Sequence, residues 1–283
     1  MSSIAENIET ATQVLQESGI AEARREANSL LVLALEKDKA FLIAHPEYEL
    51  SNEEETRFRA GLRRRAAREP FQYIAGRQEF YGLDFEVSPG VLIPRPETES
   101  IVENAIEILR EKENPRFCEI GVGSGCISIA ILHRIKTARA MSVDVSEKAL
   151  QVAQRNAEKH DVSTRIDLKI SDLFAELENE KFDLIVSNPP YISSEDFKAL
   201  QPEVKNFEPR DALTDGQNGL SVIERIVIQS PNFLSSGGFL LMEIGFGQAE
   251  KVRGIFSPKI WQTVEFLPDL QGIPRTVKAV KNE

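Results

Sequence analysis

A polar turn that follows an apolar segment carries the most specific chemistry of the chain. Residues 182–186 run directly into Ser187-Asn188-Pro189-Pro190-Tyr191. The two prolines fix the backbone and remove two N–H donors, so the side-chain oxygen of Asn188 and the carbonyl of Pro189 remain as acceptors. Two acceptors beside the Tyr191 ring suit a planar NH2 group, because they hold both N–H bonds and aim the nitrogen lone pair. The turn therefore predicts catalytic and substrate-binding residues Asn188, Pro189, Pro190 and Tyr191; a rigid proline turn without chemistry is the alternative.

A glycine-rich turn lies further towards the N-terminus, at Glu119-Ile120-Gly121-Val122-Gly123-Ser124-Gly125. Glycines at alternate positions permit a tight turn and let a ligand approach the backbone closely. A dinucleotide-binding turn would need a further glycine where Cys126 stands. The spacing therefore favours S-adenosylmethionine as the cofactor, with predicted contacts at Glu119, Gly121, Val122, Gly123, Ser124 and Gly125.

Two further carboxylates follow expected strands. Asp144 comes nineteen residues after Gly125, where a carboxylate is placed to accept both ribose hydroxyls, with Val145 beside it. The alternative for this segment is helix capping, a task that suits Ser146. Asp172 and Leu173 are predicted to lie against the adenine, although an Asp after a strand is often only part of a turn. With Asn188, these residues complete the predicted cofactor site.

The elements needed to position these turns are strands alternating with helices. Strands are expected near Phe117, up to Val143, over 166–170 and over 182–186, with helices from Cys126 and Ser146. This order predicts an α/β fold, a parallel sheet with helices on both faces, whose ligand lies beyond the carboxyl ends of the strands. The first seventy residues show only helical apolar stripes, such as Ile4, Ile8, Ala11 and Leu15. We predict a helical substrate-recognition domain over 1–70, a hairpin linker over 71–93 and a catalytic domain over 94–283.

The composition limits the possible partners. The chain of 283 residues has a formal net charge of −11, which argues against a protein whose task is to grip nucleic acid. Apolar runs are far shorter than the roughly 20 residues of a membrane span, and no signal peptide is expected, so a cytoplasmic location is predicted. Cys118 and Cys126 are interpreted as buried thiols, and the three histidines have no metal-ligand spacing. The arginine-rich stretch 57–68 is interpreted as a solvated helix face, with contact to an acidic partner or ribosomal RNA as the alternative.

The glycine turn, Asp144 and the Asn-Pro-Pro-Tyr segment together resemble class I, Rossmann-like methyltransferases that act on planar exocyclic nitrogens. The segment Ile93-Pro94-Arg95-Pro96-Glu97-Thr98-Glu99 resembles a second signature, that of the release factor glutamine N5-methyltransferases. The order of parts is similar too: an N-terminal helical domain, a β-hairpin and this catalytic sheet. The chain departs from the pattern at Glu119, where Asp is common, and at Leu173, where an aromatic residue is common.

The resemblance implies methyl transfer from S-adenosylmethionine to the glutamine of the Gly-Gly-Gln loop of class 1 peptide chain release factors. It places Arg95 and Glu97 at the entrance as substrate-binding residues, while Thr98 is interpreted as a helix cap. A monomer without metal, membrane or nucleic-acid partner is expected. The alternatives are a ribosomal-protein glutamine methyltransferase and a nucleic-acid adenine N6-methyltransferase.

Overall fold

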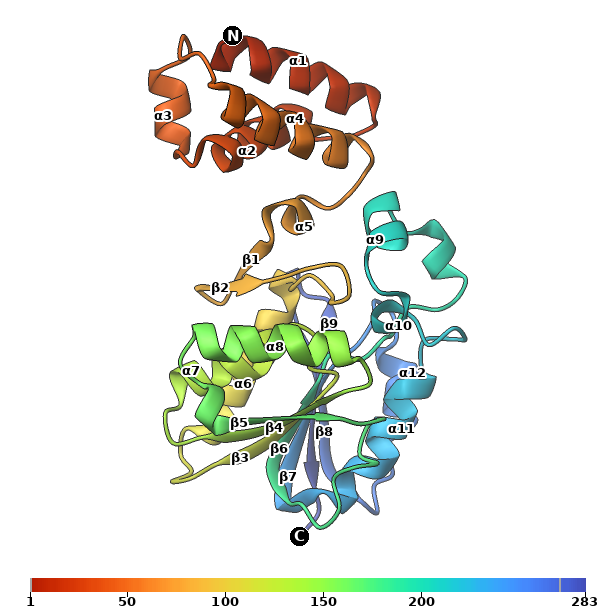
Figure 1. Cartoon of the computed structure of the whole chain (residues 1–283). Coiled ribbons are helices and arrows are strands. Elements are labelled where there is room, and N and C mark those ends of the chain that lie inside the picture. Colours follow the sequence, from red (N-terminus) through yellow and green to blue (C-terminus); the bar gives the residue numbers. More distant parts are fainter. Residues whose placement is uncertain (1, 270) are drawn as a thin grey trace. The chain divides into compact units, whose positions relative to one another are not determined.

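The computed structural model describes residues 2–269 and 271–283, which form two compact units (Figure 1). One unit contains the chain up to Gly76 together with Gln201–Phe207, and the other contains Arg77–Leu200 and Glu208–Glu283. The first unit thus includes a short segment from far along the chain, which was not part of the helical domain predicted over 1–70.

The first unit is a helical bundle, as the apolar stripes predict. Ile4, Ala11 and Leu15 of the first stripe are fully buried, whereas Ile8 is partly buried. Ser3 and Ser51 each begin a helix with a reciprocal capping box, in which the side chain accepts from the third helical N–H. The helices of this unit are α1 (Ile4–Glu17), α2 (Ala23–Leu35), α3 (Lys39–Ala44), α4 (Asn52–Ala66), α5 (Phe71–Ala75) and α9 (Pro202–Phe207).

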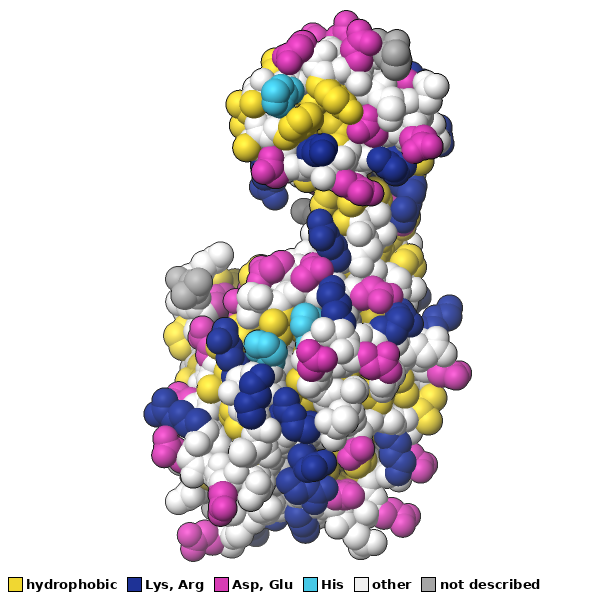
Figure 2. Space-filling model, turned by 60° about the vertical axis from the view of Figure 1, so that its left-hand side comes forward, with side chains coloured by type: hydrophobic (Ala, Val, Ile, Leu, Met, Phe, Trp, Pro, Cys, Tyr) yellow, Lys and Arg dark blue, Asp and Glu magenta, His cyan; other side chains and the backbone are white. Residues whose placement is uncertain are grey.

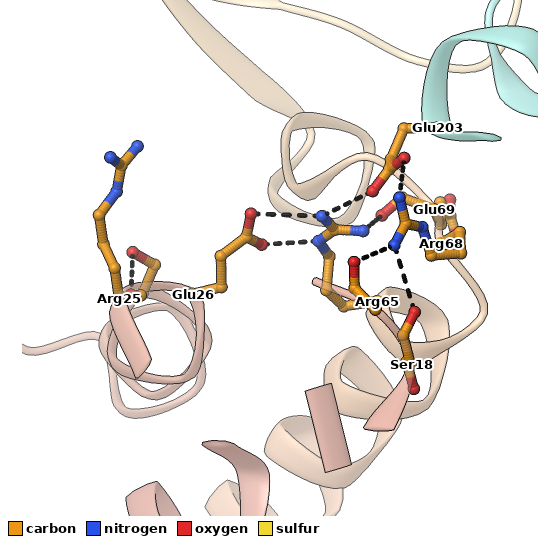
Figure 3. A network of polar contacts seen from close by, with 9 residues as sticks. Ser18, Arg25, Glu26, Arg65, Arg68, Glu69 and Glu203 are labelled. Atoms are coloured by element: carbon orange, nitrogen blue, oxygen red, sulfur yellow. Dashed lines mark hydrogen bonds and ion pairs between the residues drawn. The ribbon is translucent and has the colours of Figure 1, made fainter. Parts of the chain in front are cut away.

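Arg65 corrects the interpretation of the arginine-rich stretch as a solvated face. The residue is only 5% exposed, because position 65 shares a face of α4 with the buried residues Phe58 and Gly61. Arg65 Nε donates to Glu26 Oε2 at 2.6 Å, and Arg65 Nη2 donates to Glu203 Oε1 at 3.1 Å (Figure 3). Arg68 Nη2 reaches the other oxygen of Glu203 at 2.7 Å. The two arginines therefore hold α9 within the helical unit.

The hairpin of the linker is shorter than predicted. It consists of β1 (Arg77–Phe80) and β2 (Leu83–Glu86), paired antiparallel about Tyr81 and Gly82, while the preceding residues form α5. Phe80 and Phe85 are buried and contact edge to face with ring centroids 6.1 Å apart. The hairpin therefore contributes to the core of the second unit.

The second unit is built on a seven-stranded sheet in the order β5-β4-β3-β6-β7-β9-β8. The first five strands in that order are parallel, as predicted, whereas β9 runs antiparallel to both of its neighbours. Their bounds are β3 (Arg116–Ile120), β4 (Arg139–Asp144), β5 (Ile166–Ile170), β6 (Phe182–Ser187), β7 (Leu234–Glu243), β8 (Trp261–Pro268) and β9 (Pro274–Lys281).

Helices cover both faces of this sheet (Figure 1). Successive strand residues alternate between the two layers: Leu241 packs with α6 and α7, and Leu240 packs with α11 and α12. The long helices are α6 (Glu99–Leu109), α7 (Cys126–Arg134), α8 (Glu147–Lys159) and α11 (Ser221–Gln229). Shorter ones are η1 (Pro96–Thr98), η2 (Ser163–Arg165), η3 (Asp196–Ala199), α10 (Arg210–Leu213), η4 (Ser230–Asn232) and α12 (Ala249–Arg253). None of the helices in the described residues is long and apolar enough to cross a membrane.

Candidate active site

A cavity of about 490 Å³ lies at the carboxyl ends of the parallel strands, where the fold places ligands. Its volume is in the range of small-molecule sites. Most of the residues that the sequence singles out line it, namely Arg95, Glu119, Gly121, Val122, Gly123, Ser124, Asp144, Val145, Asp172, Leu173, Asn188, Pro189 and Pro190. Gly125, Glu97 and Tyr191 are not among the lining residues, and Glu97 is exposed.

The glycines of the turn between β3 and α7 are required for two different reasons. Gly121 and Gly123 have positive φ angles of 79° and 54°, and a Cβ added at either would meet no protein atom within 4 Å. A Cβ at Gly125 would instead lie 2.8 Å from Ile129 Cδ1 and 3.2 Å from Ala153 Cβ. The first two glycines thus leave space beside the backbone for a ligand, and the third allows close packing of α7 and α8.

Asp144 is held by backbone donors at the end of β4. Gly123 N donates to its Oδ2 at 3.0 Å, and Ser146 N donates to its Oδ1 at 2.9 Å. Burial raises the pKa of the Asp144 carboxyl, and these hydrogen bonds oppose the shift. Ser146 caps α8 as predicted, since its Oγ accepts from Ala149 N at 3.3 Å. Asp144 therefore keeps acceptor capacity at the cavity while Ser146 serves the helix.

Glu119 is a buried carboxyl with an unused acceptor. Ser128 N donates to its Oε2 at 3.0 Å, but Oε1 has no partner in the described part of the chain. Burial raises the pKa of Glu119 to about 8. A buried acceptor without a donor is costly unless a ligand satisfies it. Together with the open glycine backbone and Asp144, this carboxyl fits S-adenosylmethionine, which carries an ammonium and a sulfonium charge.

The turn that follows β5 is partly engaged by a contact within the chain. Asp172 is exposed and pairs with Arg225 Nη2 of α11 at 2.8 Å. Leu173 has a left-handed φ of 54° and is buried at the cavity wall. An apolar wall beside a paired carboxylate suits the face and the edge of a purine ring.

The turn predicted to be catalytic is fixed by partners that the sequence did not indicate. Ser187 Oγ donates to the carbonyl of Ile120 at 2.8 Å, which ties the end of β6 to β3. Asn188 Nδ2 donates to Thr98 Oγ1 at 3.1 Å, so the Asn188 Oδ1 is left as an acceptor. Thr98 is therefore not the predicted helix cap: it makes no side-chain capping bond, and its hydroxyl donates to Glu243 Oε2 at 2.7 Å instead.

Tyr191 shares this network without lining the cavity. Its hydroxyl donates to Glu243 Oε1 at 3.0 Å, and its carbonyl accepts from Gln248 Nε2 at 2.8 Å. Burial, and then the nearby charge of Glu243, raise the pKa of Tyr191, so the phenol stays protonated. Glu243 follows the apolar run 239–242 at the end of β7, and the rule that pointed to the other strand ends also applies to this residue.

Arg95 is engaged by a buried carboxylate. Arg95 Nη2 donates to Glu208 Oε1, and Ile93 N donates to Glu208 Oε2 at 3.1 Å. Glu208 belongs to a segment, 208–216, whose role the sequence did not reveal. Glu208 anchors the loop that carries Arg95 at the cavity wall, whereas Glu97 is exposed and does not line the cavity.

Comparisons with known proteins cover nearly the whole chain. The family model described as PrmC N-terminal domain matches residues 6–76, and the methyltransferase small domain matches 102–204. A release factor glutamine methyltransferase of Geobacter sulfurreducens is 46% identical over 263 residues, covering 93% of this chain and 91% of that protein. The protein of the same name from Koribacter versatilis is 39% identical over 270 residues, covering 95% of each.

Solved structures resemble a large part of the chain at the level of the fold. A Pyrococcus furiosus methyltransferase matches with a TM-score of 0.54, over 72% of this chain and 91% of that one. The hMettl16 catalytic domain, solved in complex with an RNA hairpin, matches with a TM-score of 0.58, over 71% of this chain and 76% of that one. Both are 16% identical to this chain, so they support the architecture alone.

Proposed function

The chain belongs to the release factor glutamine methyltransferase family, and we propose that it transfers a methyl group from S-adenosylmethionine to the side-chain amide nitrogen of a release factor glutamine. The observation that carries the proposal is the orientation of Asn188. Its NH2 group donates to Thr98, so its oxygen is the atom left to accept a hydrogen bond at a cavity whose glycine turn and carboxylates fit the cofactor.

The cofactor supplies an electrophilic methyl group on sulfur when it is bound. Gly121 and Gly123 leave space beside the backbone, Asp144 would accept from the ribose hydroxyls, and Glu119 would offer its unpartnered oxygen to a positively charged group. Asp172 and Leu173 are assigned to the adenine. Each assignment can be tested by substituting one side chain at a time.

The substrate amide needs orientation more than it needs a base. Its nitrogen lone pair is delocalised into the carbonyl, which makes it a poor nucleophile. The Asn188 Oδ1 and the Pro189 carbonyl would accept one N–H each, which aligns the nitrogen for in-line attack. A cationic product nitrogen releases its proton readily, so no group has to remove it before transfer.

We assign the glutamine to the Gly-Gly-Gln loop of class 1 release factors, and its recognition to the helical unit. We propose that the chain acts as a monomer. The buried free thiols Cys118 and Cys126 suit a reducing compartment, and we place the reaction in the cytoplasm.

The charge distribution argues against a nucleic-acid substrate. Burial, and then the charges of Lys136 and Arg134, lower the pKa of His133 at the end of α7. His133, Arg134 and Lys136 lie shortly before the start of β4, at the amino ends of the parallel strands, opposite to the cavity. On the face drawn in Figure 2, basic side chains form a band over the lower part of the molecule, and acidic side chains lie around it. A cleft that tracks phosphates would need its basic residues beside the reaction site.

The experiment that tests the proposal is intact-mass spectrometry of a purified, unmethylated release factor after incubation with the protein and S-adenosylmethionine, followed by peptide mapping. We expect one added methyl group, on the Gly-Gly-Gln glutamine. A release factor with Asn in place of that glutamine is the control. No methylation of the release factor, with methylation of a ribosomal protein or of adenine in parallel assays, would overturn the proposal.

A further inference from the structure

We propose that Glu243 is a positioning residue, which sets the direction of the hydrogen-bond chain through Thr98 to Asn188 and thereby presents the Asn188 oxygen to the substrate. The inference rests on the proposed function, because it explains how an acceptor, and not a donor, faces the glutamine NH2 group. It concerns a residue that lies outside the cavity wall.

Glu243 is the last residue of β7 and is only 3% exposed. Its side chain lies on the face of the sheet that Phe239 and Leu241 share, because strand residues alternate between faces. On that side it meets Thr98, whose Oγ1 is 2.7 Å from Oε2, and Tyr191, whose hydroxyl is 3.0 Å from Oε1. Each carboxylate oxygen thus has one hydroxyl donor.

The direction of the hydrogen-bond chain follows from the number of protons that each group can donate. A carboxylate has no proton to donate, so both hydroxyls must donate to it. A threonine hydroxyl has a single proton, and Thr98 uses it on Glu243. The remaining lone pairs of Thr98 Oγ1 can then only accept, and they accept from Asn188 Nδ2 at 3.1 Å.

This direction of the hydrogen bonds decides which way the side-chain amide of Asn188 is turned, which the shape of the side chain leaves open. The oxygen and the NH2 group of an asparagine side chain are nearly equal in size, so only the hydrogen-bond network selects the orientation. With Nδ2 held by Thr98, Oδ1 is the free atom of Asn188. The site then binds an NH2 group and disfavours a carboxylate at the same place.

Charged and titratable groups around Glu243 shift its pKa in opposite directions. Burial raises the pKa of Glu243, whereas the hydroxyls of Thr98 and Tyr191 and the charge of Arg275 oppose the rise; Glu97 adds to it. The two hydroxyl donors favour the charged form of Glu243 against the effect of burial.

The same carboxylate holds the second part of the catalytic turn. Tyr191 is bound through its hydroxyl by Glu243 and through its carbonyl by Gln248. Glu243 therefore connects the start of the turn, through Thr98 and Asn188, with its end at Tyr191. Removing the carboxylate frees both ends together.

The test compares Glu243→Gln and Thr98→Val with the wild-type protein. Gln keeps the size of Glu but replaces one acceptor by a donor, so one of the two hydroxyls loses its acceptor. We expect kcat on the release factor to fall at least about 30-fold in each variant, with cofactor Kd within threefold. Because both substitutions act through the same hydrogen-bond chain, kcat of the double variant should be little lower than kcat of either single variant.

Two matched variants separate positioning from a loss of packing. Thr98→Ser keeps the hydroxyl and should retain kcat within about threefold. Thr276→Val removes a buried hydroxyl from β9, where Thr276 pairs with Glu243 in the sheet but its hydroxyl contacts Ser100. Thr276→Val should leave kcat unchanged. Equal losses in Thr276→Val and Thr98→Val would overturn the inference, as would additive losses or an unchanged kcat in Glu243→Gln.

A readout without activity keeps the inference distinct from the proposed function. The side-chain amide resonances of Asn188 report the bond to Thr98 directly by NMR. They should shift in Thr98→Val and Glu243→Gln and stay in place in Thr276→Val. If the wild-type protein fails to methylate the release factor, the proposed function fails, and these resonances still decide the hydrogen-bond chain. Asn188 resonances that do not move in Thr98→Val would overturn it.

Discussion

At the scale of single residues, we assign Asn188 to the substrate and the glycine turn and the carboxylates to the cofactor. Its Oδ1 is the acceptor assigned to the substrate nitrogen, while the turn and carboxylates that suit the cofactor come from other segments. We expect Asn188→Ala to lower kcat by at least about 100-fold, the scale seen when one oriented hydrogen-bonding group is removed. Cofactor affinity, measured by calorimetry, should stay within about threefold; a large loss would contradict the assignment.

Glu119 should make the stability of the protein depend on pH. Burial raises the pKa of its carboxyl from 4.5 to about 8. Between these values the folded chain retains a proton that the unfolded chain has released, so the free energy of unfolding falls as pH rises. The contribution of Glu119 is complete below pH 4.5 and is lost through about pH 8, with a slope of at most about 1.4 kcal/mol per pH unit.

Urea unfolding at several pH values measures this slope, and Glu119→Gln removes the titrating group. We expect a flatter dependence in the variant over the same range. S-adenosylmethionine, with its positive charge, should favour the ionised carboxylate and therefore release a proton on binding to the wild-type protein. Identical slopes in both proteins would assign the pH dependence to other groups.

At the scale of elements, the turn between β3 and α7 has separate requirements at its two ends. Gly125→Ala would bring a Cβ within 2.8 Å of Ile129 Cδ1 at a φ of 83°. We expect a loss of about 2–4 kcal/mol in unfolding free energy, from backbone strain and overpacking. Gly121→Ala meets no protein atom, so it should cost only about 1–2 kcal/mol of stability.

Cofactor affinity should show the opposite order, because the new methyl group of Gly121→Ala enters the space assigned to the ligand. Urea unfolding and calorimetry on the two variants provide the comparison. Equal effects of both substitutions on stability and on affinity would show that the glycines do not have distinct tasks.

At the scale of the whole molecule, the chain leaves the second unit after Leu200, joins the helical unit and returns at Glu208. Glu203 secures this excursion by accepting from Arg65 and Arg68. Glu203→Ala should cost about 1.5–3 kcal/mol, the scale of hydrogen bonds to charged groups. It should also speed amide exchange in α9. The exposed pair of Arg59 and Glu55 is the control, and Glu55→Ala should cost about 0.5 kcal/mol or less. Slow exchange in the Glu203 variant would assign the hold on α9 to other contacts.

Local patterns determined much of this protein from its sequence. The helices from Cys126 and after Ser146 and the strand over 166–170 lie where periodicity and capping residues place them. The convergence of the candidate residues could also be predicted, because carboxyl ends of parallel strands meet at one edge of the sheet and each strand is followed by a polar residue a few positions after an apolar run. Asn188, Asp144 and Glu119 meet at one cavity for that reason.

Tertiary structure alone decided which side chains support the site. Thr98 and Glu243 are 145 positions apart, and Arg65 and Glu203 are 138 apart. Such pairs depend on how strands align and how segments return, and they leave no periodic signal in either segment. A threonine before a helix is typical of a cap, and an arginine in a charged helix is typical of a solvated residue. Only packing against distant carboxylates turned Thr98 into a donor to Glu243 and buried Arg65 beside Glu203.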